Sequence, residues 1–199
     1  MPSATEDPKG ALGRVEKRFY RDLLATAVEF SRTPPRLEEL GFAEGVTIRK
    51  YLRDAHPPRF PAPGGIEVIE VEGSDSPFGE IVALGSGRAG WTASVFAHLP
   101  GRQGWRCYLA LVDEKPMAAA AMLVDGKVAQ FGLAATVETA RKGAQLALMR
   151  RRIEDATALG VRQFAADVEV DDEAGSVAGR RDLRDAGFRP AYERDAWLD

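Results

Sequence analysis

Three apolar runs joined by very short turns lie between residues 105 and 135, and they constrain the fold more than any other feature of this chain. The runs are WRCYLALVD, MAAAAMLV and KVAQFGLAA, and the turns between them are Glu114-Lys115-Pro116 and Asp125-Gly126. Asp-Gly between two apolar runs is a strong signal for a β-hairpin. A crossover between parallel strands needs about a dozen residues or more, so neither turn has room for one. The sequence therefore predicts an antiparallel meander.

The third run continues directly into a helical segment at residues 136–160. Leu146, Met149, Ile153 and Ala156 form its apolar face, and Gly160 ends it. A strand (VRQFAADVEV), an acidic turn, a helix (GRRDLRDAG) and a last strand (FRPAYERDAWL) follow. The predicted order is strand, strand, strand, helix, strand, helix, strand. This order indicates an α/β (α+β) fold with a mixed, mainly antiparallel twisted sheet flanked by helices.

The N-terminal third is expected to be mostly helical. Residues 14–31 have apolar side chains at three- and four-residue steps, which is typical of an amphipathic helix. RLEELGF and EGVTIRKYLRDA predict shorter helical stretches before the proline-rich loop HPPRFPAPGG, and the alternating IEVIEVEG at 66–73 predicts a strand. We expect a disordered tail at 1–12 and a single domain at 13–199, with a helical segment at 13–65 and a core at 66–199.

The segment IVALGSGRAGWTASVF, residues 81–96, carries glycines at the spacing of a dinucleotide-binding turn. Asp113 stands about twenty residues past Gly90, where such folds place a ribose-binding acid. The meander that follows Asp113 removes the parallel sheet on which that interpretation depends. We therefore interpret Gly85, Gly87 and Gly90 as a connection from a strand to a helix. An enzyme that binds NAD or S-adenosylmethionine at GSGRAG remains a less favoured alternative, since Ala83-Leu84 precede the turn where a methyltransferase has an acid.

Composition argues against several classes of partner. The 27 basic and 30 acidic residues give a net charge of -3, and no concentrated basic stripe of the kind that binds nucleic acid is present in the sequence. No apolar run reaches the ~18 residues that span a bilayer, and the first residues lack a signal pattern, so we expect no membrane partner and a cytoplasmic location. His56 and His98 lack companions at metal-ligand spacing, so no metal is expected. Cys107 is the only cysteine and is expected to be a core residue.

A family resemblance rests on two motifs in the second half of the chain. The strand that runs into ARKGAQ (residues 140–145) and a long helix, together with a later AGF-x-x-x-Y, resembles the GNAT acyl-CoA-dependent N-acetyltransferases. In that superfamily the turn reads roughly R-x-x-G-x-[GA]. The resemblance extends from about Trp105 to Leu198, and more loosely over 88–99. It implies a GNAT-like sheet, acetyl-CoA as the acyl donor and a primary amine as the acceptor.

The resemblance also assigns a cofactor site. A helix N-terminus presents unpaired N–H groups and a positive dipole end, and glycine lets a pyrophosphate approach closely. The turn would hold the pyrophosphate of coenzyme A, and the strand end would pair with the pantetheine. The residues implied are Leu133, Ala134, Ala135, Thr136 and Val137 on the strand, Arg141, Lys142, Gly143, Ala144, Gln145 and Leu146 at the turn, and Asp182 farther along.

The sequence departs from the family pattern at several positions. Ala140 stands where the family usually has Arg or Gln, and Val137 stands where a proline is common. Asp182 stands where many relatives have an Asn that contacts the cofactor. Arg180 stands where some relatives have a tyrosine that protonates the leaving thiolate. The third strand ends in QFGLAA and offers no acid where relatives often have a carboxylate base.

Acetylation of an amine needs a base for the amine proton and is helped by an acid for the departing thiolate. Asp167, on the same strand face as Glu169, is the candidate base, and the alternative is a strand-end acid that faces solvent or pairs with an arginine. Tyr192 is the candidate acid, with a packed aromatic as the alternative. Trp105 and Tyr108 are expected to pack in the core rather than to line the acceptor pocket.

These observations predict an N-acetyltransferase that moves an acetyl group from acetyl-CoA to an amine. The departures keep a second hypothesis open, namely a GNAT-fold module that binds acyl-CoA without efficient turnover and acts as a sensor or partner. The acceptor is not indicated by the sequence, and a homodimer remains an open alternative. In either case, GSGRAG is a candidate for a loop beside the acceptor cleft.

Overall fold

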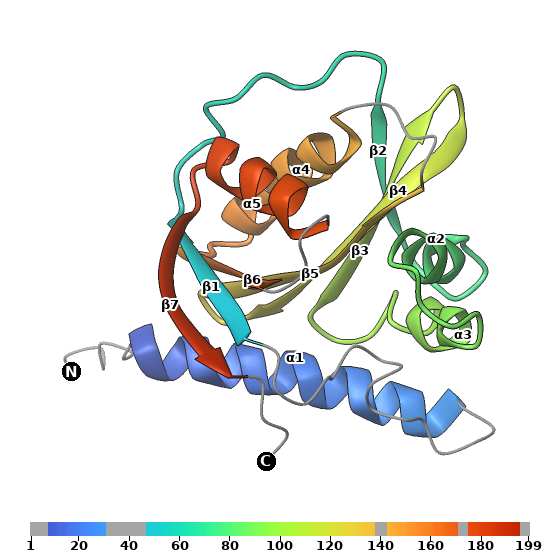
Figure 1. Ribbon diagram of the computed structural model, residues 1–199, viewed down its shortest axis with the longest axis horizontal. Helices are drawn as coiled ribbons and strands as arrows, with labels where there is room; N and C mark the ends of the chain where they lie inside the picture. Colours follow the sequence, from blue (N-terminus) through green and yellow to red (C-terminus); the bar gives the residue numbers. More distant parts are fainter. Residues whose placement is uncertain (1–7, 31–46, 138–142, 171–174, 196–199) are drawn as a thin grey trace.

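The computed structural model describes residues 8–30, 47–137, 143–170 and 175–195 of the chain. A seven-stranded sheet runs through it in the order β2-β3-β4-β5-β6-β1-β7 (Figure 1). Its strands are β1 (Thr47–Asp54), β2 (Glu67–Val71), β3 (Trp105–Val112), β4 (Lys115–Asp125), β5 (Val128–Thr136), β6 (Gln163–Glu169) and β7 (Arg189–Asp195). Only β5 and β6 pair in parallel, and every other pair of neighbouring strands is antiparallel. The predicted mixed, mainly antiparallel sheet is confirmed.

Helices cover both faces of this sheet. They are α1 (Pro8–Phe30), α2 (Phe78–Gly85), α3 (Thr92–Ala97), α4 (Ala144–Ala158) and α5 (Gly175–Asp185). The core on one face includes buried residues of α4 and α5, and the core on the other includes residues of α1, α2 and α3. In Figure 1, α4 and α5 lie above the sheet and α1 runs below it. Alternate residues of β4 serve the two cores, because successive side chains of a strand point to opposite faces.

The meander β3-β4-β5 is confirmed, and so is the order of elements that follows it. Gly126, in the second turn, has a φ of 59°. The first turn lies one residue earlier than predicted, at Asp113 and Glu114, whose φ angles are 49° and 63°. Two consecutive residues with positive φ are the mark of the type I′ turn, whose twist suits a two-residue hairpin.

The predicted amphipathic helix is confirmed as α1, and it begins earlier than expected. Because α1 starts at Pro8, residues 8–12 of the predicted disordered tail are helical. Val15, Phe19 and Leu23 are buried on its apolar face. The stretch RLEELGF, predicted to be helical, lies outside the described residues.

The helix predicted within EGVTIRKYLRDA is wrong, because residues 47–54 form the strand β1. This strand lies inside the sheet, antiparallel to β6 on one side and to β7 on the other. Two of its charged residues, Lys50 and Arg53, are buried. Lys50 finds ionic partners and Arg53 donates to the carbonyl oxygens of Asp54 and Ala186. Residues 47–54 are therefore part of the core sheet and not of a helical segment.

The strand predicted to precede GSGRAG is also wrong, because Ile81 to Leu84 belong to α2. The glycines therefore connect two helices. A Cβ on Gly85 would lie 2.7 Å from the backbone nitrogen of Thr136, so this position needs glycine to let α2 pack closely on the end of β5. An apolar run this short fits a strand or a buried helix equally well, and the tertiary packing decides between them.

Candidate active site

The parallel strands β5 and β6 part in the middle of the sheet. Their pairing runs from Val128 with Gln163 to Phe131 with Ala166. β5 then continues to Thr136 and β6 to Glu169 without further pairing between them. A bulge on β5 accompanies this separation: the register with β4 shifts between Ala119 and Ala121, and Leu133 has a φ of 51°. The result is an open gap in the hydrogen-bond ladder at the carboxyl ends of two central strands.

The N-terminus of α4 follows the end of β5. Gly143 precedes the helix with a φ of 99°, a left-handed conformation that favours glycine. Among the residues that the structure describes, no side chain caps this helix end, and its first intrahelical bond is donated by the Ala147 nitrogen to the Gly143 carbonyl oxygen. The amides of Ala144, Gln145 and Leu146 precede that bond and need partners from outside the helix. Such a terminus favours an anion, which is what the resemblance to GNAT enzymes implied.

Gln145 uses its side chain to tie this helix end to the sheet. Its amide nitrogen lies 2.7 Å from the carbonyl oxygen of Ala135 and 2.9 Å from the hydroxyl of Thr136. A third contact, at 3.3 Å, joins it to the carbonyl oxygen of Ala119. The side chain of Gln145 is therefore engaged within the protein, and only its backbone amide is available for a ligand at the turn.

Asp167 is the first residue of β6 beyond the last pair with β5, and it lies in a network of polar groups. Lys50 Nζ is 2.7 Å from its Oδ1, and the hydroxyl of Tyr20 donates to its Oδ2 at 2.9 Å. The amide of Gln130 also reaches Oδ2, at 3.3 Å. Asp167 is therefore ion-paired, with Lys50 at 2.7 Å and with Arg194 at 3.9 Å, and its role as a base stays a prediction.

The helix α1 closes this network from below the sheet. Glu16 is 3.2 Å from Lys50 Nζ and also pairs with Arg194. Lys50 is only 1% exposed, so its charge needs the two carboxylates around it. Burial, and then the charge of Asp167, raise the pKa of Tyr20 well above its ordinary value. Tyr20 is therefore a hydrogen-bond donor at neutral pH.

Tyr192 lies on the same side of the sheet as Asp167. Both residues are paired in register with Lys50, one on β6 and one on β7, so they lie two strand spacings, or about 10 Å, apart. Tyr192 is 45% exposed, and its pKa is raised by burial and then by the charges of Glu16 and Asp167. Tyr192 is thus a partly exposed side chain and not a fully packed aromatic. The two candidate catalytic residues flank one buried lysine.

The GSGRAG loop borders the gap. Gly85 abuts Thr136 at the end of β5, and the pKa of Arg88 is lowered by its burial, with the charge of Glu169 acting in the opposite direction. Arg88 is therefore close to the end of β6. The loop thus approaches the ends of both strands, and its place beside an acceptor cleft stays a prediction.

Other predicted residues are placed less informatively. Arg141 and Lys142 lie outside the described residues. Asp182 is half-buried on α5, where burial and the neighbouring Asp185 raise its pKa, and no contact in the described part of the chain joins it to Gly143. Trp105 and Tyr108 are buried in the two cores, which confirms that they pack rather than line a pocket.

Sequence reasoning missed Glu16, Tyr20 and Lys50. One signal was present: Glu16 and Tyr20 are four residues apart, next to the buried Val15 and Phe19, so two polar groups border the apolar stripe of α1. No such signal pointed to Lys50, whose partners are far away in the sequence.

Comparisons with known proteins agree with this geometry. Neither a protein-family model nor a curated protein sequence matches the chain. Among solved structures, it is similar to a GCN5-related N-acetyltransferase from Sphaerobacter thermophilus, with a TM-score of 0.59 and 19% identity over 81% of this chain and 55% of that one. The chain has the GNAT fold.

Two further structures with the GNAT fold are similar to the chain. A GNAT-family acetyltransferase from Colwellia psychrerythraea gives a TM-score of 0.57 and 16% identity over 75% of this chain and 54% of that one. A GCN5-related N-acetyltransferase from Kribbella flavida gives a TM-score of 0.54 and 19% identity over 75% of this chain and 58% of that one. This chain thus corresponds to just over half the length of each of these proteins. The identities are low, so the likeness concerns the GNAT fold alone.

The membrane question has a direct structural answer for the part of the chain that is described. No helix in residues 8–30, 47–137, 143–170 or 175–195 is long and apolar enough to cross a bilayer.

Proposed function

We propose that this protein binds an acyl-coenzyme A, with acetyl-CoA as the donor, in the gap between β5 and β6 and transfers the acyl group to a primary amine. The observation that carries the proposal is the combination of two parted parallel strands with an uncapped helix N-terminus at the left-handed Gly143. The fold supports it, because GNAT acetyltransferases are among its structural neighbours.

The donor's parts match different groups of the chain. The backbone of residues 133–137 offers unpaired strand edge to the amides of the pantetheine, since β6 has left β5 at this point. The amides of Ala144, Gln145 and Leu146 and the positive end of the α4 dipole suit the pyrophosphate. Gly143 keeps side-chain bulk away from that approach.

The transfer itself forms one bond and breaks another. The nitrogen of the neutral amine attacks the thioester carbonyl carbon, the C–S bond breaks, and coenzyme A leaves as a thiolate that takes up a proton. We assign Asp167 as the group that accepts the amine proton, directly or through a water, and Tyr192 as the hydroxyl that protonates the thiolate. Tyr192 is 45% exposed, which suits this second role.

A second candidate function follows from the contacts of Asp167. Lys50, Tyr20 and Gln130 already surround this carboxylate. A carboxylate whose oxygens are already held by an ion pair and hydrogen bonds within the fold is less available to contact a substrate amine. This observation favours a module that binds acyl-CoA without efficient turnover.

One pair of measurements separates the two candidates. Thermal unfolding is recorded with acetyl-CoA, NAD and S-adenosylmethionine in parallel, because a ligand of the native state raises the midpoint. We expect acetyl-CoA alone to raise it, and stabilisation by NAD alone would refute the proposal. Release of free thiol is then followed with a panel of primary amines. Release that depends on the amine identifies the enzyme, and binding without release identifies the module.

A further inference from the structure

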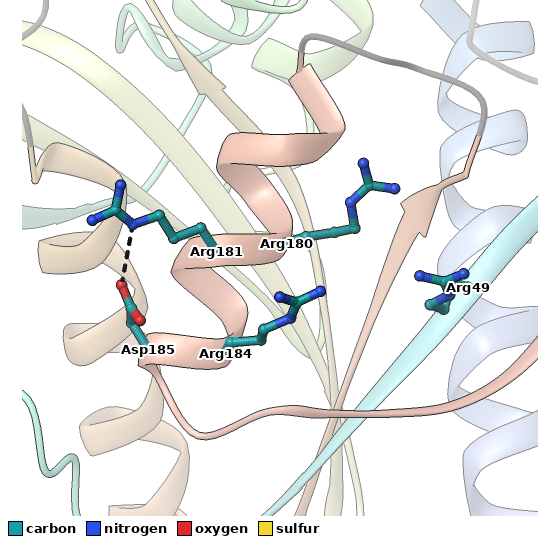
Figure 2. Close-up of a pocket in the computed structure, with 5 residues that line it drawn as sticks. All are labelled: Arg49, Arg180, Arg181, Arg184 and Asp185. Atoms are coloured by element: carbon teal, nitrogen blue, oxygen red, sulfur yellow. Dashed lines mark ion pairs between the residues drawn. The ribbon is translucent and has the colours of Figure 1, made fainter.

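A cationic cavity lies between α5 and β1, on the other side of β6 from the proposed acyl-CoA gap. It has a volume of about 480 Å³ and is lined by Arg49, Arg180, Arg181, Arg184 and Asp185. Figure 2 shows Arg180 and Arg184 extending from α5 on the side where Arg49 lies, whereas Arg181 points away toward Asp185. We call this the arginine cavity.

The charges of the arginine cavity are only partly matched by the protein. Arg49 pairs with Glu193, and Arg181 lies 3.9 Å from Asp185. Arg180 and Arg184 have no acidic partner in the described part of the chain. These two residues are four apart on one helix, where like charges repel each other. Within the described residues, these two guanidinium groups therefore have no carboxylate that matches their charge.

A second observation comes from Tyr51, which lies on β1 two residues after Arg49. Tyr51 is fully buried, and its hydroxyl has no hydrogen-bond partner among the described residues. After Glu193, an interaction with the hydroxyl of Tyr51 raises the pKa of Arg49, so this hydroxyl lies beside that guanidinium without a well-formed hydrogen bond to it. Arg49 is thus the polar neighbour available to this buried hydroxyl. Tyr51 therefore helps to hold Arg49 at the edge of the cavity.

We propose that the arginine cavity binds the dianionic phosphate group of a small phosphate monoester. The two uncompensated guanidinium groups match its two negative charges, and the planar fork of arginine matches phosphate oxygens in bidentate fashion. The volume is within the range of about 300–1,000 Å³ that small-molecule sites occupy. The guanidinium of Arg49 offers further donors at the edge of the site.

Titration calorimetry at constant ionic strength tests this proposal with two probes of nearly the same shape. Phenyl phosphate carries close to two negative charges at pH 7.5, and phenyl sulfate carries one. Inorganic phosphate is a third probe, which separates recognition of the phosphate alone from recognition of a monoester. We expect phenyl phosphate to bind more tightly than phenyl sulfate.

The variants are Arg180→Gln combined with Arg184→Gln, and the matched control Arg162→Gln. Arg162 is an exposed arginine just before β6, about 20 Å along the strands from the level of Arg49. The double variant should lose at least about tenfold in affinity for phenyl phosphate, because hydrogen bonds to charged groups are strong. The control should keep its affinity. Without ligand, the double variant should melt no lower than the wild type, because it has lost a repulsion.

Three results would overturn the proposal. They are unchanged affinity in the double variant, an equal loss in Arg162→Gln, and equal affinity for the two phenyl probes, which indicates unspecific attraction of anions. Stabilisation by acetyl-CoA should be unaffected in the double variant. Its loss would make these arginines part of the acyl-CoA site and refute a separate phosphate site, whereas the proposed function would stand.

Discussion

Lys50 and Arg49 are neighbours on β1, yet they belong to charge clusters of opposite character. Lys50 faces α1, is 1% exposed and lies between the carboxylates of Glu16 and Asp167. Arg49 is on the α5 side, is 30% exposed and borders a cavity where Arg180 and Arg184 lack acidic partners in the described part of the chain. A buried charge must be matched within the fold, whereas a solvated cluster tolerates an excess. The unbalanced cluster is therefore the one with capacity for a ligand.

The largest expected effect concerns the balanced cluster. Lys50→Met removes the buried cation and leaves Glu16 and Asp167 with Arg194, which is 31% exposed, as their remaining cation among the described residues. Breaking a buried ion pair in this way typically costs about 3–5 kcal/mol. Arg49→Met is the matched control on the same strand, and its loss of stability should be much smaller, because solvent screens the exposed pair with Glu193. The free energy of unfolding in urea measures both. Equal losses in the two variants would contradict the distinction between the clusters.

Arg152 sharpens the comparison, because it is fully buried without a carboxylate partner in the described residues. Its guanidinium donates to the carbonyl oxygen of Ala121 at 3.0 Å and lies over the ring of Phe131, 4.5 Å from its centroid. Burial lowers the pKa of Arg152 to about 9. Replacement of unmatched buried charge by an apolar side chain of similar size often stabilises a protein, so Arg152→Met should gain up to about 2 kcal/mol.

Urea unfolding of Arg152→Met decides the point. A loss of about 3 kcal/mol or more would mean that the backbone carbonyls and the ring of Phe131 compensate this charge as fully as a carboxylate does.

The smallest expected effect is a pH dependence that arises from Tyr20. Its pKa is raised in the folded state, so folding favours the neutral hydroxyl. The stabilisation is complete below the unfolded pKa of about 10 and is lost as the pH rises above it, with a slope of up to about 1.4 kcal/mol per pH unit. Tyr20→Phe should flatten this part of the profile. An unchanged slope between pH 10 and 11 would show that Tyr20 does not titrate differently in the folded state.

The parts of the fold that follow from local patterns could be predicted. The meander depends on short turns, and the place of Gly143 depends on a strand, a glycine and an apolar helix in succession. The strand β1 could not be predicted, because Lys50 and Arg53 resemble solvated residues until their partners are known. The partners in this network are distant in the sequence: Lys50 and Gln130 are separated by 80 positions, and Tyr20 and Asp167 by 147. Asp167 could be named as a candidate, but its ion pair depends on that long-range packing.

Binding of acetyl-CoA at Gly143 is tested most directly by titration calorimetry on the wild type, Gly143→Ala and Gly160→Ala. Gly143 and Gly160 lie at opposite ends of α4 with φ angles of 99° and 84°, so alanine introduces similar backbone strain at both, about 1–2 kcal/mol. A Cβ at Gly143 also meets Pro63 Cβ at 3.1 Å, whereas nothing lies within 4 Å of one at Gly160. We predict that the wild type and Gly160→Ala bind acetyl-CoA and that Gly143→Ala loses at least about tenfold in affinity. Equal affinities in all three proteins, or no binding by the wild type, would contradict the assignment of this turn to acyl-CoA.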